Sequence, residues 1–214
     1  MDKKVKIESK FLLAVEGKDE CNFFKALLTH LEITEVQLID IGGKDNFLLE
    51  FPALTFLEGF NSIERLGFVR DAETRPAQSA FSSVCMMLQK HKLPVPAKPN
   101  EIICEGALRL GIYIMPDNAG TGMLENLCLA SIALMPISEC IEKYIQCFST
   151  CQEKEEKSAY NDSKARVQTY LASRAPLVNS LGLGALRGYW DFHHQCFDGI
   201  KDFIKQLFRE RVCK

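Results

Sequence analysis

Long apolar runs are missing from this chain of 214 residues. No uninterrupted apolar stretch reaches the roughly 18 residues that a membrane-spanning helix needs. The first ten residues mix lysine with glutamate and lack the architecture of a signal peptide. Charged residues make up 25% of the chain and hydrophobic residues 47%, which is ordinary for a globular protein and argues against disorder. We therefore expect a cytoplasmic protein with no membrane association.

The chain also lacks an excess of positive charge. Its net charge is −2 and its isoelectric point is near 6.1, so it lacks the excess of basic residues expected of a domain that coats nucleic acid. This absence does not exclude nucleic acid as a ligand. A protein that holds phosphates through bridging metal ions needs fewer lysines and arginines than one that relies on charge neutralisation alone.

The cysteines of this chain do not follow the pattern of a disulfide framework. The nine cysteines are odd in number, and their spacings fit neither a compact disulfide scaffold nor a structural zinc site. Cys85, Cys104, Cys128 and Cys140 lie among apolar neighbours in the sequence. We expect the cysteines to be reduced, with these four behaving as small buried apolar residues.

What the chain does contain is an alternation of strand and helix patterns. Strand patterns cover residues 11–15, 36–41 and 66–69, and the helical patterns after them cover about 21–31, 45–58 and 76–91. The short continuous apolar runs are typical of strands that are buried on both faces. This order predicts an α/β fold with a mostly parallel sheet flanked by helices.

The remainder of the chain is mainly helical in pattern. Proline-rich residues 92–100 predict a connector, and residues 101–115 predict a hairpin or two short strands. Helical patterns then cover about residues 124–155, with a break near Pro136, and residues 162–174 and 190–212. We therefore predict an α/β core in residues 1–130 and a helical extension in residues 131–214 that packs on the core.

Acidic residues follow three of the predicted strands. Glu16 follows the first strand, Asp71 and Glu73 follow the third, and Asp117 follows the last apolar run. Ligands of open α/β sheets bind outside the carboxyl ends of the strands, so these side chains are expected to converge there. Such a cluster repels itself unless a cation sits in it. Hard oxygen donors suit Mg²⁺ or Mn²⁺, whose usual work is phosphate chemistry.

The order of these motifs resembles the TOPRIM domain, which topoisomerases, primases and OLD-type nucleases share. Glu16 and Gly17 match the first signature of that family, in which the glutamate at the end of a strand is the candidate general acid or base. Asp71 and Glu73 stand where the family carries an Asp-x-Asp pair for metal binding. Glu73 departs from the pattern, and its longer side chain would approach a metal from a different angle.

Two further segments resemble compact TOPRIM-like proteins of bacteria and archaea. Residues 42–47 resemble their glycine turn, and residues 116–126 resemble a later segment in which a Gly-x-x-Glu, here Gly122 to Glu125, brings another carboxylate near the metals. The resemblance covers about residues 11–130. It implies a TOPRIM-like fold in which a C-terminal helical extension follows the sheet.

The same resemblance implies a set of roles. Asp71, Glu73 and Glu125 would hold Mg²⁺ or Mn²⁺, and Glu16 would be catalytic, either by helping to bind metal or by activating the attacking water. The expected chemistry is phosphodiester cleavage of DNA or RNA. No ATPase is present in this sequence, so the resemblance leaves open a minimal nuclease or one that works with a protein partner such as an ATPase.

Basic residues beside the acidic positions complete the candidate site. Lys18, Lys44 and Arg70 are candidates for holding a phosphate, or they are ordinary surface charges.

The acidic residues have structural explanations as well. Glu16 and Asp71 could cap helices, Glu73 could belong to a capping turn, and Asp117 could be a turn residue. Asp19 and Glu125 are also favourable charges for the first turn of a helix.

Two other functions therefore stay open. One is a non-catalytic regulatory or nucleotide-binding protein, and the other is a phosphohydrolase for a small metabolite. The oligomeric state is open too.

Overall fold

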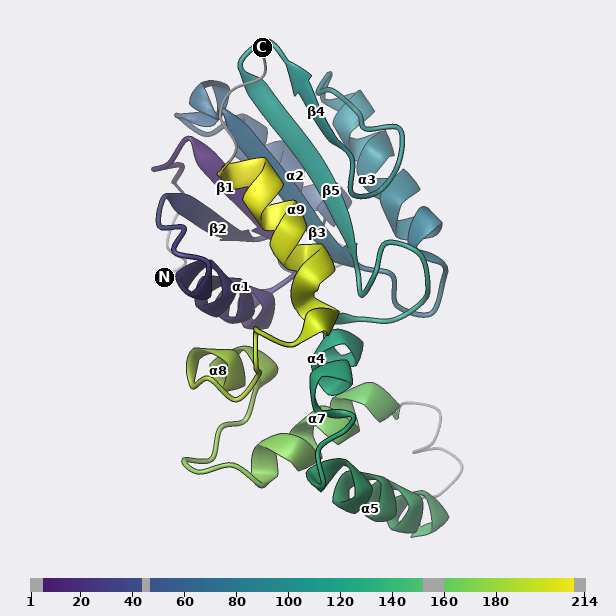
Figure 1. Cartoon of the computed structure of the whole chain (residues 1–214). Coiled ribbons are helices and arrows are strands. Elements are labelled where there is room, and N and C mark those ends of the chain that lie inside the picture. The colour runs from purple at the N-terminus through teal and green to yellow at the C-terminus, as the bar shows by residue number, and fades with distance from the viewer. Residues whose placement is uncertain (1–5, 44–46, 152–159, 210–214) are drawn as a thin grey trace.

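The computed structural model describes residues 6–43, 47–151 and 160–209. It confirms the predicted α/β class, with a five-stranded sheet in the order β2-β1-β3-β5-β4 (Figure 1). The strands are β1 (Phe11–Val15), β2 (Val36–Asp40), β3 (Arg65–Asp71), β4 (Ile102–Glu105) and β5 (Leu108–Met115). β1 pairs in parallel with β2 and β3, and β3 pairs in parallel with β5. β4 and β5 form the predicted hairpin, in which β4 runs antiparallel.

The helices follow the predicted order, apart from one short helix at Leu181–Leu186 that the sequence pattern did not predict. They are α1 (Lys18–His30), α2 (Phe47–Thr55), α3 (Ala77–Lys90), α4 (Leu124–Ile132), α5 (Ile137–Cys151), α7 (Asp162–Ala172), α8 (Leu181–Leu186) and α9 (Asp198–Phe208). The break predicted near Pro136 separates α4 from α5. Among the described residues, no helix has both the length and the apolar character needed to cross a bilayer.

One predicted helix begins later than expected. The pattern in residues 190–212 predicted a helix from Trp190, but α9 begins at Asp198, after a short 3₁₀ turn at Gln195–Phe197. Trp190 and Phe192 are buried in the apolar core that includes α1. The indole Nε1 of Trp190 donates to the Leu181 carbonyl at 3.0 Å, and the Phe192 carbonyl accepts from Lys201 Nζ at 2.8 Å. Tertiary contacts therefore bury these aromatic residues without a helix.

The sheet separates two apolar cores. Leu13 and Val15 of β1 face the core that includes α1 and α9, whereas Leu12 and Ala14 face the core that includes α3. Figure 1 shows α1 and α9 in front of the sheet and α3 behind it. Burial on both faces explains why β1 is a continuous apolar run.

Segments from the predicted extension return to the sheet. α9 lies against β3 and β5, where Gly67 and Gly111 give it room: a Cβ atom at Gly111 would lie 2.8 Å from the Phe203 ring. The short helix α8 packs beside α1, while α5 and α7 project away from the sheet (Figure 1). The boundary near residue 130 stays a prediction.

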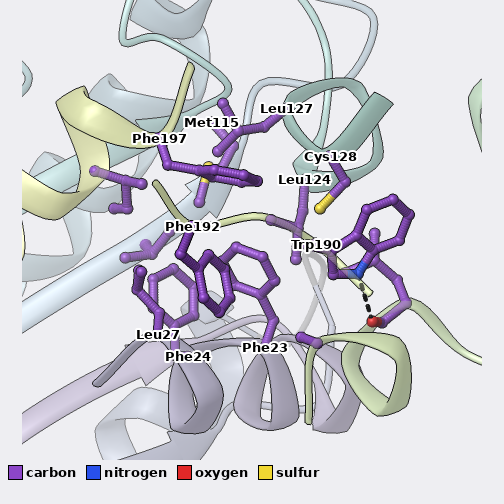
Figure 2. Close-up of a cluster of buried hydrophobic side chains, with 14 of the residues drawn as sticks. Phe23, Phe24, Leu27, Met115, Leu124, Leu127, Cys128, Trp190, Phe192 and Phe197 are labelled. Atoms are coloured by element: carbon purple, nitrogen blue, oxygen red, sulfur yellow. Dashed lines mark hydrogen bonds between the residues drawn. The ribbon is translucent and has the colours of Figure 1, made fainter. Parts of the chain in front are cut away.

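An aromatic cluster joins α1, α4 and the segment before α9. Figure 2 shows Phe23 of α1, Phe192 and Phe197 close to Leu124 and Cys128 of α4. The rings of Phe23 and Phe192 meet edge to face with centroids 5.4 Å apart, a favourable geometry for an aromatic pair. This packing fixes the start of α4 against α1, at the carboxyl end of the sheet.

The cysteines depart in part from expectation. Cys128 is buried as predicted, but Cys104 is disulfide-bonded, so the prediction of reduced cysteines is wrong at that position. Cys104 lies on the edge strand β4, where its side chain is exposed rather than packed in a core. Cys140 is exposed as well, because it lies outside the face of α5 that buries Ile141 and Ile145. Apolar neighbours in the sequence do not guarantee burial on a half-exposed strand or helix.

Candidate functional site

The ends of β1 and β3 bring Glu16 and Asp71 together. These strands are adjacent and parallel, with Ala14 opposite Phe68, so both acidic residues leave the sheet at the same edge. The Asp71 backbone N–H donates to Glu16 Oε1 at 3.2 Å. Gly17 then starts the turn into α1 in an extended conformation, and no side-chain hydrogen bond caps that helix. Capping of α1 therefore does not explain the position of Glu16.

Asp71 also contacts the start of α4. Its Oδ1 accepts from the backbone N–H of Leu124, the first residue of that helix, at 3.1 Å. A helix N-terminus favours negative charge, so this bond stabilises the ionised carboxylate. Asp71 therefore accepts a hydrogen bond at a helix N-terminus, as a helix-capping acid would. The bond also ties α4, which carries Glu125, to the end of β3.

Glu73 sits in a fixed and uncommon conformation. Its φ of 58° lies in the left-handed region, which is sparsely populated by residues other than glycine. Two backbone hydrogen bonds of 2.7 Å, one in each direction, hold Glu73 to Gly122. α3 begins after Pro76 with no side-chain cap, so a capping role of Glu73 is not seen. The surroundings therefore impose this conformation, as is common near functional sites.

Burial and like charges raise the pKa values of the carboxyl groups. The pKa of Glu16 is raised to about 7, mainly by burial and in smaller part by the charges of Glu20 and Glu73. The N–H of Asp71 and the Arg70 guanidinium act in the opposite direction, with Arg70 Nε 3.5 Å from Glu16 Oε1. The side chain of Glu16 is only 12% exposed. This carboxyl group is therefore balanced between its protonated and ionised forms near neutral pH.

Asp71 shows the same effect more strongly. Burial raises its pKa well above the usual range, and the charges of Glu16, Glu125 and Glu20 add to this effect. Burial is also the main cause of the raised pKa values of Glu125 and Glu20. The structure thus gathers Glu16, Asp71, Glu73 and Glu125 within electrostatic reach of one another.

Other predicted residues have different surroundings. Asp19 Oδ1 accepts from the Gly182 N–H at 2.7 Å, which anchors α8 to α1. Asp117 is a turn residue, since its Oδ1 accepts from the N–H groups of Ala119 and Gly120. Lys44 lies outside the described residues.

Sequence reasoning missed two residues near the site. Glu20 lies in the first turn of α1, four residues after Glu16, and this closeness in sequence could have indicated their proximity. Lys164 of α7 has no comparable sequence signal, because tertiary folding alone brings its Nζ to 4.0 Å from Glu125 Oε1.

Two cavities flank the acidic residues, each with a volume of about 530 Å³. The first is lined by Lys18, Asp19, Asn22, Glu125, Lys164, Val167, Gln168, Asn179, Ser180, Leu181 and Leu183. The second is lined by Arg70, Asp71, Ala72, Glu73, Thr74, Arg75, Ser79, Ala80, Ser83 and Met86. Glu125 therefore lines the first cavity, Asp71 and Glu73 line the second, and Glu16 lines neither.

Residues 10–209 match the family described as "Protein of unknown function (DUF3226)". The chain belongs to this DUF3226 family. No curated protein matches it. Solved structures of the C-terminal region of the OLD protein of Xanthomonas campestris pv. campestris are similar at low identity. One has a TM-score of 0.46 and 13% identity, covering 94% of this chain and 96% of that chain. Another has a TM-score of 0.39 and 14% identity, covering 92% and 85%.

The donor chemistry of this DUF3226 site fits a hard divalent cation only in part. The carboxylate oxygens suit Mg²⁺ or Mn²⁺, and a cation would relieve their mutual repulsion. Within the described parts of the chain, however, no group of three or more His, Cys, Asp or Glu side chains is arranged to hold a metal ion. Mg²⁺ commonly uses one or two protein carboxylates and completes its shell with water and substrate phosphates. The arrangement suits that kind of site rather than a closed protein cage.

Proposed function

We propose that this chain carries out metal-dependent phosphodiester chemistry on nucleic acid. The observation that carries the proposal is the contact between Glu16 and Asp71 at the carboxyl ends of adjacent strands. Both groups are largely shielded from solvent, and other carboxylates surround them, an arrangement that costs stability and marks candidate functional sites. The place is also the one where open α/β sheets bind ligands.

Each residue has a role that follows from its position. Asp71, with Glu73 and Glu125, would hold the metal, and Mg²⁺ or Mn²⁺ would supply stabilisation of the charge that develops on the phosphate. Glu16 accepts a proton from the attacking water, a role that suits a carboxyl group with a pKa of about 7. Arg70, beside Glu16, orients the phosphate through its guanidinium donors.

The motif order supports the same function. The strand-Glu-Gly signature, the Asp-x-Glu motif and the Gly-x-x-Glu segment resemble TOPRIM domains, and the fold brings Glu16, Asp71 and Glu125 near one another. The Asp-x-Glu departure at Glu73 is accommodated by a turn that is fixed to Gly122. A TOPRIM-like nuclease is therefore the function that we favour.

A calorimetric Mn²⁺ titration, with and without a non-cleavable oligonucleotide, tests the proposal. We expect the wild type to bind Mn²⁺ and Asp71→Asn to lose binding, although the asparagine keeps an oxygen that can accept from Leu124 N–H. Asp202→Asn is the matched control, because Asp202 is 64% exposed on α9 and lines neither cavity beside the acidic residues. Absence of Mn²⁺ binding under both conditions would contradict the proposal and favour a non-catalytic protein.

A cleavage panel completes the test. The wild type should cleave DNA or RNA oligonucleotides in Mn²⁺, and Asp71→Asn should not. Hydrolysis of free nucleotides without any cleavage of oligonucleotides would instead identify a small-molecule phosphohydrolase.

A further inference from the structure

We propose that the substrate is a single polynucleotide strand that crosses the carboxyl edge of the sheet and fills a cavity on each side of the acidic residues. This inference rests on the proposed function and names its substrate class. It comes from the two cavities of about 530 Å³, one of which includes Glu125 and the other Asp71 and Glu73.

The cavity on the α1 side has two ammonium groups. Lys18 comes from the first turn of α1, and Lys164 comes from α7 and is 62% exposed. The amide side chains of Asn22, Gln168 and Asn179 line the same space. Lysines beside neutral donors and acceptors suit a phosphate and its sugar, and the nearby Glu125 places that phosphate next to the acidic site.

The cavity on the α3 side has guanidinium and hydroxyl donors. Arg70 and Arg75 line it together with Ser79 and Ser83, which stand four residues apart and so share one face of α3. Guanidinium groups bind phosphate oxygens with well-defined geometry. Met86 continues the same face and is 59% exposed, which offers an apolar contact for a base at the far end.

The cavities lie on opposite faces of the sheet. α1 packs in the core that includes Leu13 and Val15, whereas α3 packs in the core that includes Leu12 and Ala14. The acidic residues lie between them, at the ends of β1 and β3. A ligand with one phosphate would occupy one cavity, but a strand with successive phosphates can occupy both.

The recessed position of Glu16 favours a single strand over a duplex. Its side chain is 12% exposed and lines neither cavity, so a phosphate that reaches it must approach a largely buried group while the neighbouring phosphates turn into the two cavities. Duplex DNA resists such a turn, since its persistence length is about 50 nm. A single strand bends freely and can follow a groove.

Fluorescence anisotropy of the full chain with a labelled 12-residue oligothymidylate, in Ca²⁺ to limit cleavage, tests this proposal. Lys164→Gln and Arg75→Gln each remove one charge, from opposite cavities. We expect each to weaken binding about ten-fold and to lower the salt slope by about 0.7. The double variant should weaken binding about 100-fold, since the two sites are independent. Lys90→Gln, at the exposed end of α3 and outside both cavities, should change nothing.

Two results would overturn the inference. An effect of only one of the two substitutions would show that one cavity alone binds the strand. Equal affinity for the single strand and for its duplex with oligoadenylate would exclude single-strand preference. If either result accompanies normal Mn²⁺ binding and oligonucleotide cleavage, the substrate assignment fails and the proposed function stands. If Mn²⁺ binding and cleavage are absent as well, the substrate assignment and the proposed function both fail. Thermal melting of each variant checks that these exposed substitutions leave the fold intact.

Discussion

The two edges of the sheet carry charges of opposite sign with different surroundings. At the amino edge, where β3 and β5 begin, Arg65 and Arg109 donate to backbone carbonyls of α9. At the carboxyl edge, where β1 and β3 end, carboxylates lie close to one another. Arg65 donates to the Phe208 carbonyl and lies over the Phe11 ring, 4.4 Å from its centroid. Arg109 donates to the Gln206 carbonyl at 2.8 Å. At the opposite edge, the charge of Glu16 disfavours ionisation of Asp71, and the charges of Glu20 and Glu73 disfavour ionisation of Glu16.

This difference separates charges that hold the fold from charges that the fold tolerates. Arginine at the amino edge satisfies the carbonyls at the end of α9 and fastens that helix to the sheet. The carboxyl edge gains no comparable stability, because burial and like charges disfavour the ionised forms of Glu16 and Asp71. A group of charges that weakens the fold is best explained by a ligand that compensates them.

The largest effect should follow from a change at the carboxyl edge. Glu16→Gln removes the proposed proton acceptor but keeps an oxygen that can accept from the Asp71 N–H, so we expect cleavage to fall at least about 100-fold. The melting temperature should stay nearly unchanged, because the variant loses a disfavoured buried charge. Single-turnover cleavage and thermal melting measure the two quantities. A large drop in melting temperature would assign Glu16 a structural role instead.

The reverse result is expected at the amino edge. Arg65→Ala removes the hydrogen bond to Phe208 and the contact with Phe11, and should lower the free energy of unfolding by about 2 kcal/mol. Mn²⁺ binding by the folded variant should match the wild type. Urea denaturation measures the loss, and Lys10→Gln is the control at the same edge. Lys10 is 63% exposed in its pair with Glu64, so its loss should cost less than about 0.5 kcal/mol. Impaired Mn²⁺ binding in folded Arg65→Ala would contradict the view that the charges of the amino edge serve only the fold.

Local pattern was sufficient to predict the sheet and the acidic residues at its edge. The apolar run of β1 ends directly before Glu16, and that of β3 ends two residues before Asp71, so the sequence marks where each strand delivers its carboxylate. Adjacent parallel pairing then brings Glu16 to Asp71. The strands and their terminal carboxylates depend on residues that are close in the chain, and the rule that parallel strands end at one edge supplies the expected convergence.

What escaped prediction depends on contacts between distant segments. Lys164 reaches Glu125 only because α7 packs near α4. The apolar pattern of residues 190–212 predicted a helix from Trp190, but the Leu181 carbonyl and the aromatic cluster hold Trp190 and Phe192 in an irregular segment (Figure 2). The disulfide at Cys104 likewise has no local sequence signal. Long-range packing thus determined the features that periodicity alone predicted wrongly or missed.

The smallest expected effect is a dependence of stability on pH that has opposite signs with and without metal. Folding raises the pKa of Glu16 from 4.5 to about 7, so between these values the folded state binds the proton more tightly than the unfolded state. The contribution of Glu16 to the free energy of unfolding is therefore fully present below pH 4.5 and is lost as the pH rises through 7.

In EDTA, wild-type stability relative to Glu16→Gln should fall by on the order of 1 kcal/mol between pH 5 and pH 7.5. Urea denaturation at several pH values measures this difference, and the glutamine variant, which cannot ionise, cancels the titration of the rest of the chain. Saturating Mn²⁺ should reverse the trend, because a cation binds the ionised carboxylates and competes with protons. A rise in relative stability with pH in EDTA would mean that the ion pair with Arg70 outweighs burial. The carboxyl edge would then resemble the amino edge, where charges stabilise the fold by themselves.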